Sequence, residues 1–370
     1  MRVCAVLALL GAWHTAGGGD PAPVYFIRSG DLHGLIDADG KTLLAPEFVE
    51  IKLGSPLIMA SKGNRTAYFD FRGNMVIKPQ EAWTQAFAEG VTPAVGTDLH
   101  GKRRWGYVTP DGGFAITPAY DYVEGFADGL AVVGVEDAWG KLKFGVIERG
   151  GKVIVPLEHD KLLTPAGGLV RAELPGRTHR VFDRNGKDIT PTGVDFAGIP
   201  SEGLVRIWSG RAQGFMSVLG AVIVKPVYAQ ASDFHDGRAR VWVDGKYGYI
   251  DAAGAMVIAP HFDSAEDFAG GLALVKESGK PAFIDPAGEL VLRTEVERAW
   301  PFSDGLAAVK QGGRHGYIDK AGKLVIAAQF TFAHPFRDGL AYVGLPKGEN
   351  GPATSAYIRK DGSVVWRAPR

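Results

Sequence analysis

One short phrase recurs along this 370-residue chain, and the repetition constrains the fold more than any other feature. The phrase reads GYIDAAG at Gly248 and GYIDKAG at Gly316, and its ten copies begin at Gly34, Ala67, Gly106, Gly145, Arg180, Gly214, Gly248, Ala282, Gly316 and Ala356. The copies are 34 residues apart from Arg180 to Gly316, 33 to 39 apart before that stretch, and 40 apart at the end. A period between about 20 and 50 residues is typical of a repeat protein.

Each repeat predicts three short strands joined by tight turns. A second phrase, such as FAGGLALVK, ends in a stretch that alternates in character over residues 272–276, which is the period of a strand. A polar turn then leads to a second strand, exemplified by residues 317–319, and a third apolar strand covers residues 256–258 in its own repeat. We expect this third strand to end at a proline such as Pro260, because proline has no amide hydrogen for pairing.

The turn before the third strand has a recurrent Asp and a recurrent Gly. The Asp recurs at Asp37, Asp70, Asp183, Asp251, Asp285 and Asp319. A ring of carboxylates is one interpretation, but Asp at the first position of a turn commonly accepts hydrogen bonds from amides two residues on. We therefore predict a type I turn closed by a left-handed Gly, such as Gly288, and a structural role for the Asp.

A single meander of about fifteen strand residues cannot bury enough apolar surface to be stable alone. The expected fold is therefore all-β, with three-stranded antiparallel meanders of about 34–39 residues that stack on one another. Residues 21–370 are expected to form a single array of about ten repeats. The spacing permits either an open β-solenoid or superhelical stack, or a propeller-like ring.

The first twenty residues differ from the array. Met1 and Arg2 precede an apolar run over residues 3–13, and a Gly-rich stretch follows, which is typical of a secretory signal peptide and linker over residues 1–20. A buried first strand is the alternative. The signal-like start predicts an exported chain that is periplasmic, cell-surface or extracellular. No later segment reaches the length of a membrane-spanning helix, so we expect no integral membrane segment after signal removal.

The phrases resemble the bacterial WG-repeat family. Its unit has an aromatic-Gly-aromatic step, an Asp, a turn Gly, an apolar triplet, Pro, and then Phe before Gly-Leu-Ala. Residues 246–275 and 314–343 follow this pattern closely, residues 145–220 follow it weakly, and Trp105-Gly106 keeps the Trp-Gly pair in register. The resemblance implies an all-β repeat scaffold found in exported or multi-domain bacterial proteins, and it implies no catalytic residues.

Catalytic signatures are absent from the sequence. There is no nucleophile elbow, zinc-binding HExxH, CxxC, P-loop or dinucleotide fingerprint. We therefore expect no enzyme activity, no cofactor and no metal, and the balance of 41 Lys+Arg against 41 Asp+Glu argues against nucleic acid as a partner. One alternative is a hydrolase-type enzyme whose site, in a ring centre or groove, uses turn Asp and loop His residues. The other is a purely structural spacer.

The most informative departures from the repeat lie in the strand that follows the second phrase. Counting from its Gly, the second and fourth residues are expected to face the core, and the third and fifth to share the opposite face. On that face three consecutive repeats carry Arg171, Arg206 and Arg240, and two carry Trp208 and Trp242. We interpret these five residues as an exposed ligand-binding patch, with packing as the alternative, because Arg binds carboxylates or phosphates and Trp stacks on sugars or cations. The predicted function is a monomeric exported scaffold that binds a cell-envelope polysaccharide or a protein.

Overall fold

The computed structural model describes residues 22–80, 85–174, 179–346 and 354–368, and every regular element among them is a strand. The predicted signal peptide over residues 1–20 lies outside the described residues. A search of the described residues for a membrane-spanning helix finds none. The chain forms two compact units, residues 1–92 and 93–370, and each is described by itself.

The strands form ten small antiparallel sheets. Unit 1 contains a sheet of β1 (Val24–Ser29), β2 (Leu32–Asp37) and β3 (Thr42–Phe48), and a sheet of β4 (Glu50–Lys52), β5 (Ile58–Lys62), β6 (Arg65–Phe69) and β7 (Met75–Gln80). Unit 2 begins with β8 (Thr92–Thr97), β9 (Arg103–Val108) and β10 (Phe114–Tyr120), then β11 (Tyr122–Val123), β12 (Leu130–Glu136), β13 (Leu142–Glu148) and β14 (Val153–His159), then β15 (Leu162–Ala166), β16 (Leu169–Glu173) and β17 (His179–Phe182).

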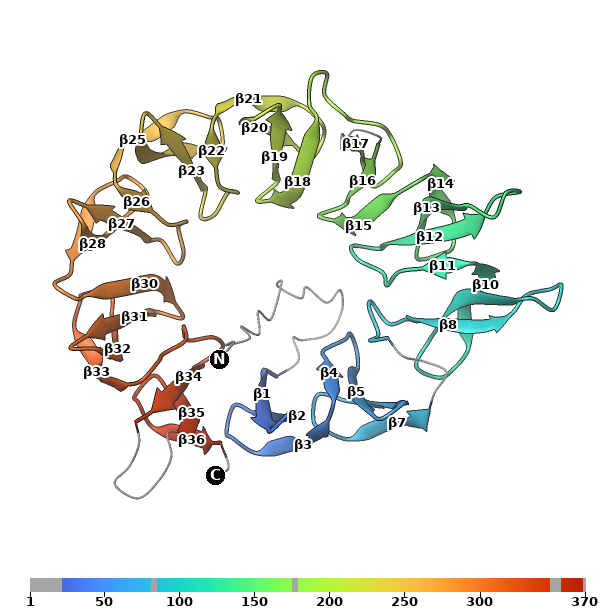
Figure 1. The fold of residues 1–370 in the computed structure, drawn as a ribbon, viewed down its shortest axis with the longest axis horizontal. Coiled ribbons are helices and arrows are strands. Elements are labelled where there is room, and N and C mark those ends of the chain that lie inside the picture. The colour runs from blue at the N-terminus through green and yellow to red at the C-terminus, as the bar shows by residue number, and fades with distance from the viewer. Residues whose placement is uncertain (1–21, 81–84, 175–178, 347–353, 369–370) are drawn as a thin grey trace. The chain divides into compact units, whose positions relative to one another are not determined.

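The remaining five sheets of unit 2 follow in chain order (Figure 1). They are β18 (Phe196–Ser201), β19 (Leu204–Ser209), β20 (Ala212–Ser217) and β21 (Val222–Tyr228); β22 (Gln230–Ala231), β23 (Arg238–Val243), β24 (Lys246–Asp251) and β25 (Met256–Phe262); β26 (Ser264–Ala265), β27 (Ala273–Glu277), β28 (Lys280–Ile284) and β29 (Leu290–Arg293); β30 (Arg298–Ser303), β31 (Leu306–Gln311), β32 (Arg314–Ile318) and β33 (Leu324–Phe330); and β34 (Leu340–Leu345), β35 (Thr354–Arg359) and β36 (Val364–Arg367).

Six of the ten sheets have four strands, so the predicted three-stranded meander is incomplete. The additional strand comes from the segment that was expected to be a return loop. In the β22–β25 sheet it is β22, where Gln230 faces Trp242 and Ala231 faces Val241 in antiparallel register. Pairing satisfies backbone groups of the return segment that would otherwise lack partners beside the buried first strand of the repeat.

The prediction that Pro ends the third strand is also wrong. Pro260 lies inside β25, which continues to Phe262. The pairing of β24 with β25 is irregular here, with Tyr247 opposite Phe262 and Tyr249 opposite Ile258. Such a bulge tolerates Pro because the residue has no ladder hydrogen bond to donate there. It also requires Gly248, since a Cβ at that position would lie 2.5 Å from the Ile258 carbonyl oxygen.

The predicted turn chemistry is confirmed. Asp251 Oδ1 accepts hydrogen bonds from the amides of Ala253 at 3.0 Å and Ala255 at 2.9 Å. Gly254 closes the turn with a φ of +83°, in the left-handed region that favours Gly. The recurrent Asp therefore holds a hairpin turn in shape, as the sequence predicted.

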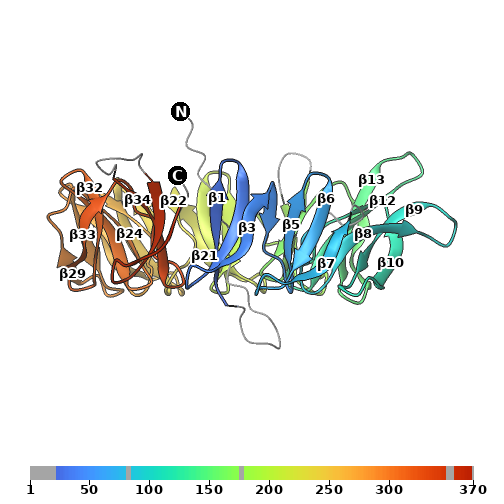
Figure 2. The ribbon, with the colours of Figure 1, turned by 90° about the horizontal axis from the view of Figure 1, so that it is seen from below.

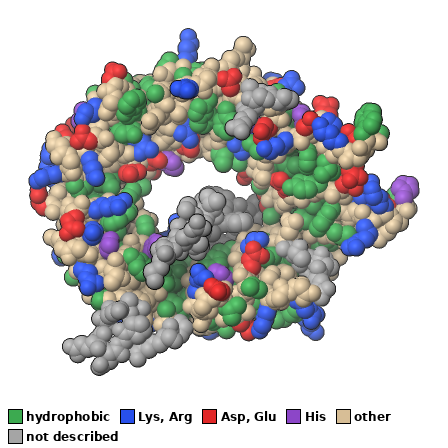
Figure 3. Space-filling model, in the orientation of Figure 1, with side chains coloured by type: hydrophobic (Ala, Val, Ile, Leu, Met, Phe, Trp, Pro, Cys, Tyr) green, Lys and Arg blue, Asp and Glu red, His purple; other side chains and the backbone are tan. Residues whose placement is uncertain are grey.

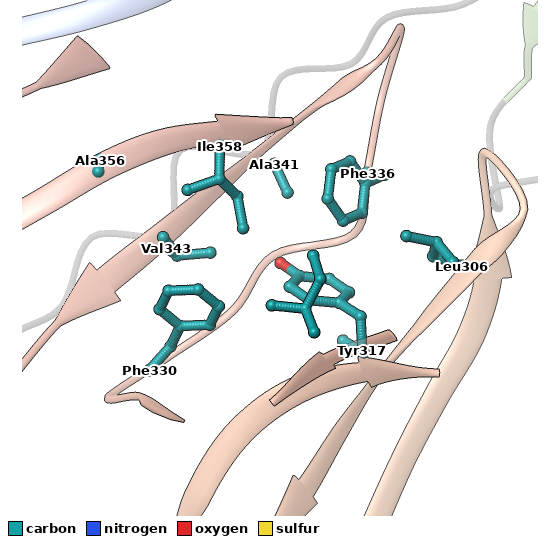
Figure 4. Close-up of a cluster of buried hydrophobic side chains, with 10 residues drawn as sticks. Leu306, Tyr317, Phe330, Phe336, Ala341, Val343, Ala356 and Ile358 are labelled. Atoms are coloured by element: carbon teal, nitrogen blue, oxygen red, sulfur yellow. The ribbon is translucent and has the colours of Figure 1, made fainter. Parts of the chain in front are cut away.

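Hydrophobic cores lie between consecutive sheets. Figure 4 shows one of them, where Tyr317 and Leu306 of one sheet face Val343 and Ile358 of the next. The ring of Tyr317 meets that of Phe336 edge-on with centroids 4.7 Å apart, and its hydroxyl donates to the His334 carbonyl at 2.7 Å. Equivalent aromatic pairs are Tyr68–Phe87, Tyr107–Phe126, Phe215–Phe234, Tyr249–Phe268 and Phe283–Phe302.

Carboxylates join neighbouring sheets within unit 2. Asp236 accepts a hydrogen bond from the amide of Gly271, 35 residues on, at 2.8 Å. The same contact joins Asp128 to Gly167, Glu202 to Gly237 and Asp304 to Gly339. Small antiparallel sheets that pack face to face in chain order are blades of the β-propeller type, one of the two arrangements that the repeats predict.

Candidate ligand-binding surface

The predicted alternation of faces is confirmed in β19. Val205 and Ile207 are fully buried, whereas Arg206 and Trp208 lie on the opposite face and are partly exposed. This face is only partly exposed, because it lies against the neighbouring sheet. The side chains of Arg206 and Arg240 each keep only 25% of their surface exposed.

Arg206 contacts the sheet that follows it. Its guanidinium lies 4.8 Å from the ring centroid of Trp208, and its Nη1 donates to the backbone carbonyl of Ala231. Its Nε lies 3.1 Å from Oδ1 of Asp233, which follows β22. Arg206 and Trp208 therefore stack on each other, and the positive charge of Arg206 is neutralised by Asp233 of the next sheet.

Arg240 repeats this arrangement one sheet further along. Its Nη1 donates to the Ala265 carbonyl, and its Nη atoms lie 3.7 Å from Glu266 and 3.9 Å from Asp267. Its guanidinium lies over the ring of Tyr247 at 5.4 Å, and the structure gives no such stack with Trp242. We call the contact surface between the β22–β25 and β26–β29 sheets the Arg240 junction.

Arg171 lies at the equivalent place between the β15–β17 and β18–β21 sheets, which we call the Arg171 junction. It is 8% exposed, and no ion pair or hydrogen bond to its side chain is found among the described residues. Its Nε is buried without an acceptor. Burial lowers the pKa of Arg171, because the charged form is separated from water.

His179 accompanies Arg171 at this junction. Its imidazole is 5% exposed, and its buried Nδ1 has no partner in the described part of the chain. Burial, and then the positive charge of Arg171, lower the pKa of His179. The imidazole therefore favours its neutral form beside the guanidinium.

Aromatic rings connect this buried pair to the surface. His179 packs on Phe196 with ring centroids 4.1 Å apart, and Phe196 meets Trp208 edge-on at 5.0 Å. Trp242 is half-buried in the next sheet, between Gln230 and Tyr247 in register. The structure thus groups Arg171, Arg206 and Trp208 around one sheet, and places Arg240 and Trp242 on the following sheet. His179 and Phe196 were not predicted as site residues. His179 nevertheless stands at a repeated position, directly before the first phrase, where other repeats carry Trp105, Phe144, Tyr247 or His315.

Unit 1 contains a groove of about 490 Å³ between its two sheets. The buried side chains of Leu44, Phe48 and Phe69 form its apolar floor. Lys62 and Arg65 lie at its polar edge, where Lys62 pairs with Glu47 at 3.0 Å. This volume is in the range of ligand sites, and the periodic pattern of the sequence carries no signal for it.

Two hairpins of unit 2 extend beyond the other strands of their sheets (Figure 2). They join β8 to β9 and β12 to β13, and their tips carry the fully exposed Leu99 and the 89% exposed Trp139. Trp139 therefore lies in a turn, outside the repeated Trp-Gly register. Elsewhere Lys/Arg and Asp/Glu side chains are interspersed over the face shown in Figure 3.

Comparisons with known proteins identify the repeat. The family model described as "WG containing repeat" matches residues 105–139, 214–247, 247–280, 282–314 and 316–345. A search of curated proteins found no match.

Among solved structures, a eukaryotic initiation factor matches with a TM-score of 0.52 and 11% identity, over 92% of this chain and 94% of that chain. Two others have lower TM-scores. BamB from Moraxella catarrhalis has a TM-score of 0.32 and 12% identity over 85% of this chain and 94% of that chain, and AztD from Citrobacter koseri has 0.33 and 14% over 80% and 91%. At 11% identity, the likeness to the initiation factor concerns the fold alone.

Proposed function

Because this chain is a WG-repeat protein, with five matched repeats between residues 105 and 345, we propose that it is an exported, non-enzymatic scaffold that binds a cell-envelope polysaccharide. Repeated sheets present an extended surface on which each unit can vary without disturbing its neighbours. The export part of the proposal is supported by the sequence of residues 1–20, with a basic start and an apolar run.

The position of Trp208 and Trp242 carries the proposal. Both occupy the fifth position of the equivalent strand on consecutive sheets, and both are half-buried, so each leaves part of an indole ring accessible. Indole rings offer flat apolar surfaces with a polar edge, a chemistry suited to sugar rings. Two such rings one repeat apart suit a polymer, whose units also repeat.

The test is cosedimentation of the purified protein with isolated peptidoglycan. We expect the double variant Trp208→Ala/Trp242→Ala to lose at least tenfold in affinity, because both ring surfaces are removed. Trp139→Ala is the matched control, since it removes an exposed indole from a hairpin tip in another sheet. Circular dichroism must show that all variants remain folded. Equal pelleting of the double variant and the wild type would reject the tryptophan surface.

A protein partner is the second candidate function, and the groove of unit 1 favours it. Its apolar floor and its polar edge, which includes Arg65, match the chemistry of a partly apolar, acidic peptide segment. We expect Arg65→Glu to abolish capture of a specific envelope protein, while Arg314→Glu does not. Arg314 is a suitable control because it begins β32 after a two-residue turn, as Arg65 begins β6. Identical captured proteins from both variants would reject this candidate.

A further inference from the structure

Three equivalent arginines at successive sheets have unequal surroundings. Arg171, Arg206 and Arg240 each stand third after the Gly of their repeat. Ala197, Ala231 and Ala265 occupy equivalent positions in the sheets that these arginines face. Each alanine lies in the first strand of its sheet and pairs in register with the second strand, with Ile207, Val241 and Val275 respectively. The comparison therefore rests on backbone pairing and not on the sequence spacing alone.

The residues after these alanines differ at the Arg171 junction. Asp233 follows Ala231 by two positions and neutralises Arg206, and Asp267 follows Ala265 by two positions beside Arg240. The corresponding residue after Ala197 is Ile199, preceded by Gly198. Arg171 thus faces a sheet in which the carboxylate of the other two junctions has been replaced by an aliphatic side chain.

The backbone contact also differs. Arg206 and Arg240 donate to the carbonyls of Ala231 and Ala265, whereas no hydrogen bond from Arg171 to Ala197 is found among the described residues. In the described part of the chain, Nε of both Arg171 and Arg206 is buried without a hydrogen-bond acceptor, but Arg206 Nε lies 3.1 Å from Asp233 Oδ1, whereas no carboxylate pairs with Arg171. A buried guanidinium without a counter-ion is unfavourable, and each buried polar group without a partner calls for a specific explanation.

The surroundings of Arg171 connect it to the proposed polysaccharide surface. Gly198 is equivalent to Ser232 and Glu266 of the next two sheets, since each follows the equivalent alanine. A Cβ on Gly198 would lie 3.5 Å from the ring of Trp208, so the indole lies close to the place that a side chain occupies at the other junctions. Phe196 packs between His179 and Trp208. These ring contacts therefore lead from His179, beside the unneutralised Arg171, to the half-buried Trp208.

We propose that the Arg171 junction binds a carboxylate of the ligand, which takes the place of Asp233 and Asp267 at the next two junctions. The guanidinium donates to the carboxylate oxygens, and Trp208 packs against the adjoining sugar. The inference rests on the proposed function and narrows it, because the polysaccharide must then carry carboxylates, as a uronate polymer or a peptide-substituted glycan does.

The test supplies the missing carboxylate within the chain. Ile199→Asp places an acidic side chain at the position of Asp233, and Ile199→Asn is a control of matched size without the charge. Calorimetric titration of the full chain compares polygalacturonate, which has a carboxylate on each sugar, with neutral dextran. We expect the wild type and Ile199→Asn to bind polygalacturonate, and Ile199→Asp to bind it at least tenfold more weakly. We also expect a higher melting temperature for Ile199→Asp than for Ile199→Asn.

If sodium acetate at millimolar concentration competes with polygalacturonate, the carboxylate alone accounts for the affinity. If acetate does not compete, the attached sugar also contributes. Equal binding by the two Ile199 variants, or equal binding of dextran and polygalacturonate, would overturn the inference. Two results separate this inference from the proposed function. If pelleting with peptidoglycan depends on Trp208 and Trp242 but both Ile199 variants bind polygalacturonate equally, only the carboxylate site is rejected. If pelleting does not depend on the two Trp residues but is weakened by Ile199→Asp, only the tryptophan surface is rejected.

Discussion

The Arg240 junction and the Arg171 junction share a backbone pattern but are filled differently. At the Arg240 junction, Tyr249 and Phe268 meet edge-on with centroids 4.9 Å apart. Val181 faces Arg171 in register, as Tyr249 faces Arg240, so a valine stands in the place of the tyrosine. Pro200 stands in the place of the Phe, three residues after the equivalent Ala.

This difference shows that turns and strand pairing maintain the sheets even where the aromatic pair is absent. The family model leaves residues 140–213 unmatched, as it does residues 1–104 and 346–370, and Arg171, Val181 and Pro200 lie in this gap. The β15–β17 sheet and the strands β18 and β19 nevertheless form there. Without the Tyr and the Phe, the Arg171 junction carries fewer packing constraints than the Arg240 junction.

The largest effect is expected from removing the aromatic pair at the Arg240 junction. Phe268→Ala should lower the free energy of unfolding by about 3–5 kcal/mol, because it leaves a cavity beside Tyr249. Pro200→Ala, its counterpart at the Arg171 junction, should cost less, since fewer buried atoms are lost. Urea unfolding of both variants measures the contrast, and equal losses would show that the two junctions are packed alike.

A smaller effect is expected at the turns that contact these junctions. Gly288 has a φ of +89°, and its Cβ would lie 3.1 Å from Ile258 across the Arg240 junction, so Gly288→Val should cost about 1–3 kcal/mol. Gly220→Val should cost more, because its Cβ would lie 2.7 Å from the backbone oxygen of Ile189. Gly245→Val isolates backbone strain, with no neighbour within 4 Å. Thermal melting curves that do not separate the three variants would contradict the steric contribution.

The hydroxyl of Tyr249 tests the polar part of the same junction. It donates to the Glu266 carbonyl at 2.7 Å, so Tyr249→Phe should cost about 0.5–1.5 kcal/mol. Phe215 and Phe283 occupy this position naturally in neighbouring sheets, which indicates that the scaffold tolerates the loss. Chemical denaturation measures the change, and a loss as large as that of Phe268→Ala would mean that the hydroxyl, and not the ring, dominates.

The smallest effect concerns pH. The hydrogen bond from Lys246 Nζ, at 2.5 Å, and the amide of Gly279 hold the pKa of Asp263 below its usual value. A carboxyl whose folded-state pKa is lowered stabilises the fold above its unfolded-state pKa, and this contribution is lost as the pH falls through the folded-state value. Lys246→Gln should raise the pKa of Asp263 in a carbon-detected NMR titration. Lys225→Gln, an exposed lysine of another sheet, should leave it unchanged; equal shifts in both variants would exclude the specific pair.

Much of the fold follows from local sequence. The Asp and Gly of each turn impose the hairpin, as at Asp251 and Gly254, and the alternation in β19 correctly assigns Val205 and Ile207 to the core. The fourth strand and the bulge at Pro260 were missed, because both depend on pairing partners that lie elsewhere in the repeat. Local patterns specify which face a residue occupies, but not what lies opposite that face.

Local sequence specifies the repeat, the order of the three predicted strands within it, the turns, and the presence of arginine and tryptophan on one face. The contacts of these side chains follow from the packing of one sheet on the next. Arg206 and Arg240 face carboxylates of the following sheet, whereas Arg171 is buried beside His179 at a junction where Ile199 stands in place of the carboxylate. Charge neutralisation and burial depend on contacts between different repeats, and a periodic sequence records its own period but not the distances across its junctions.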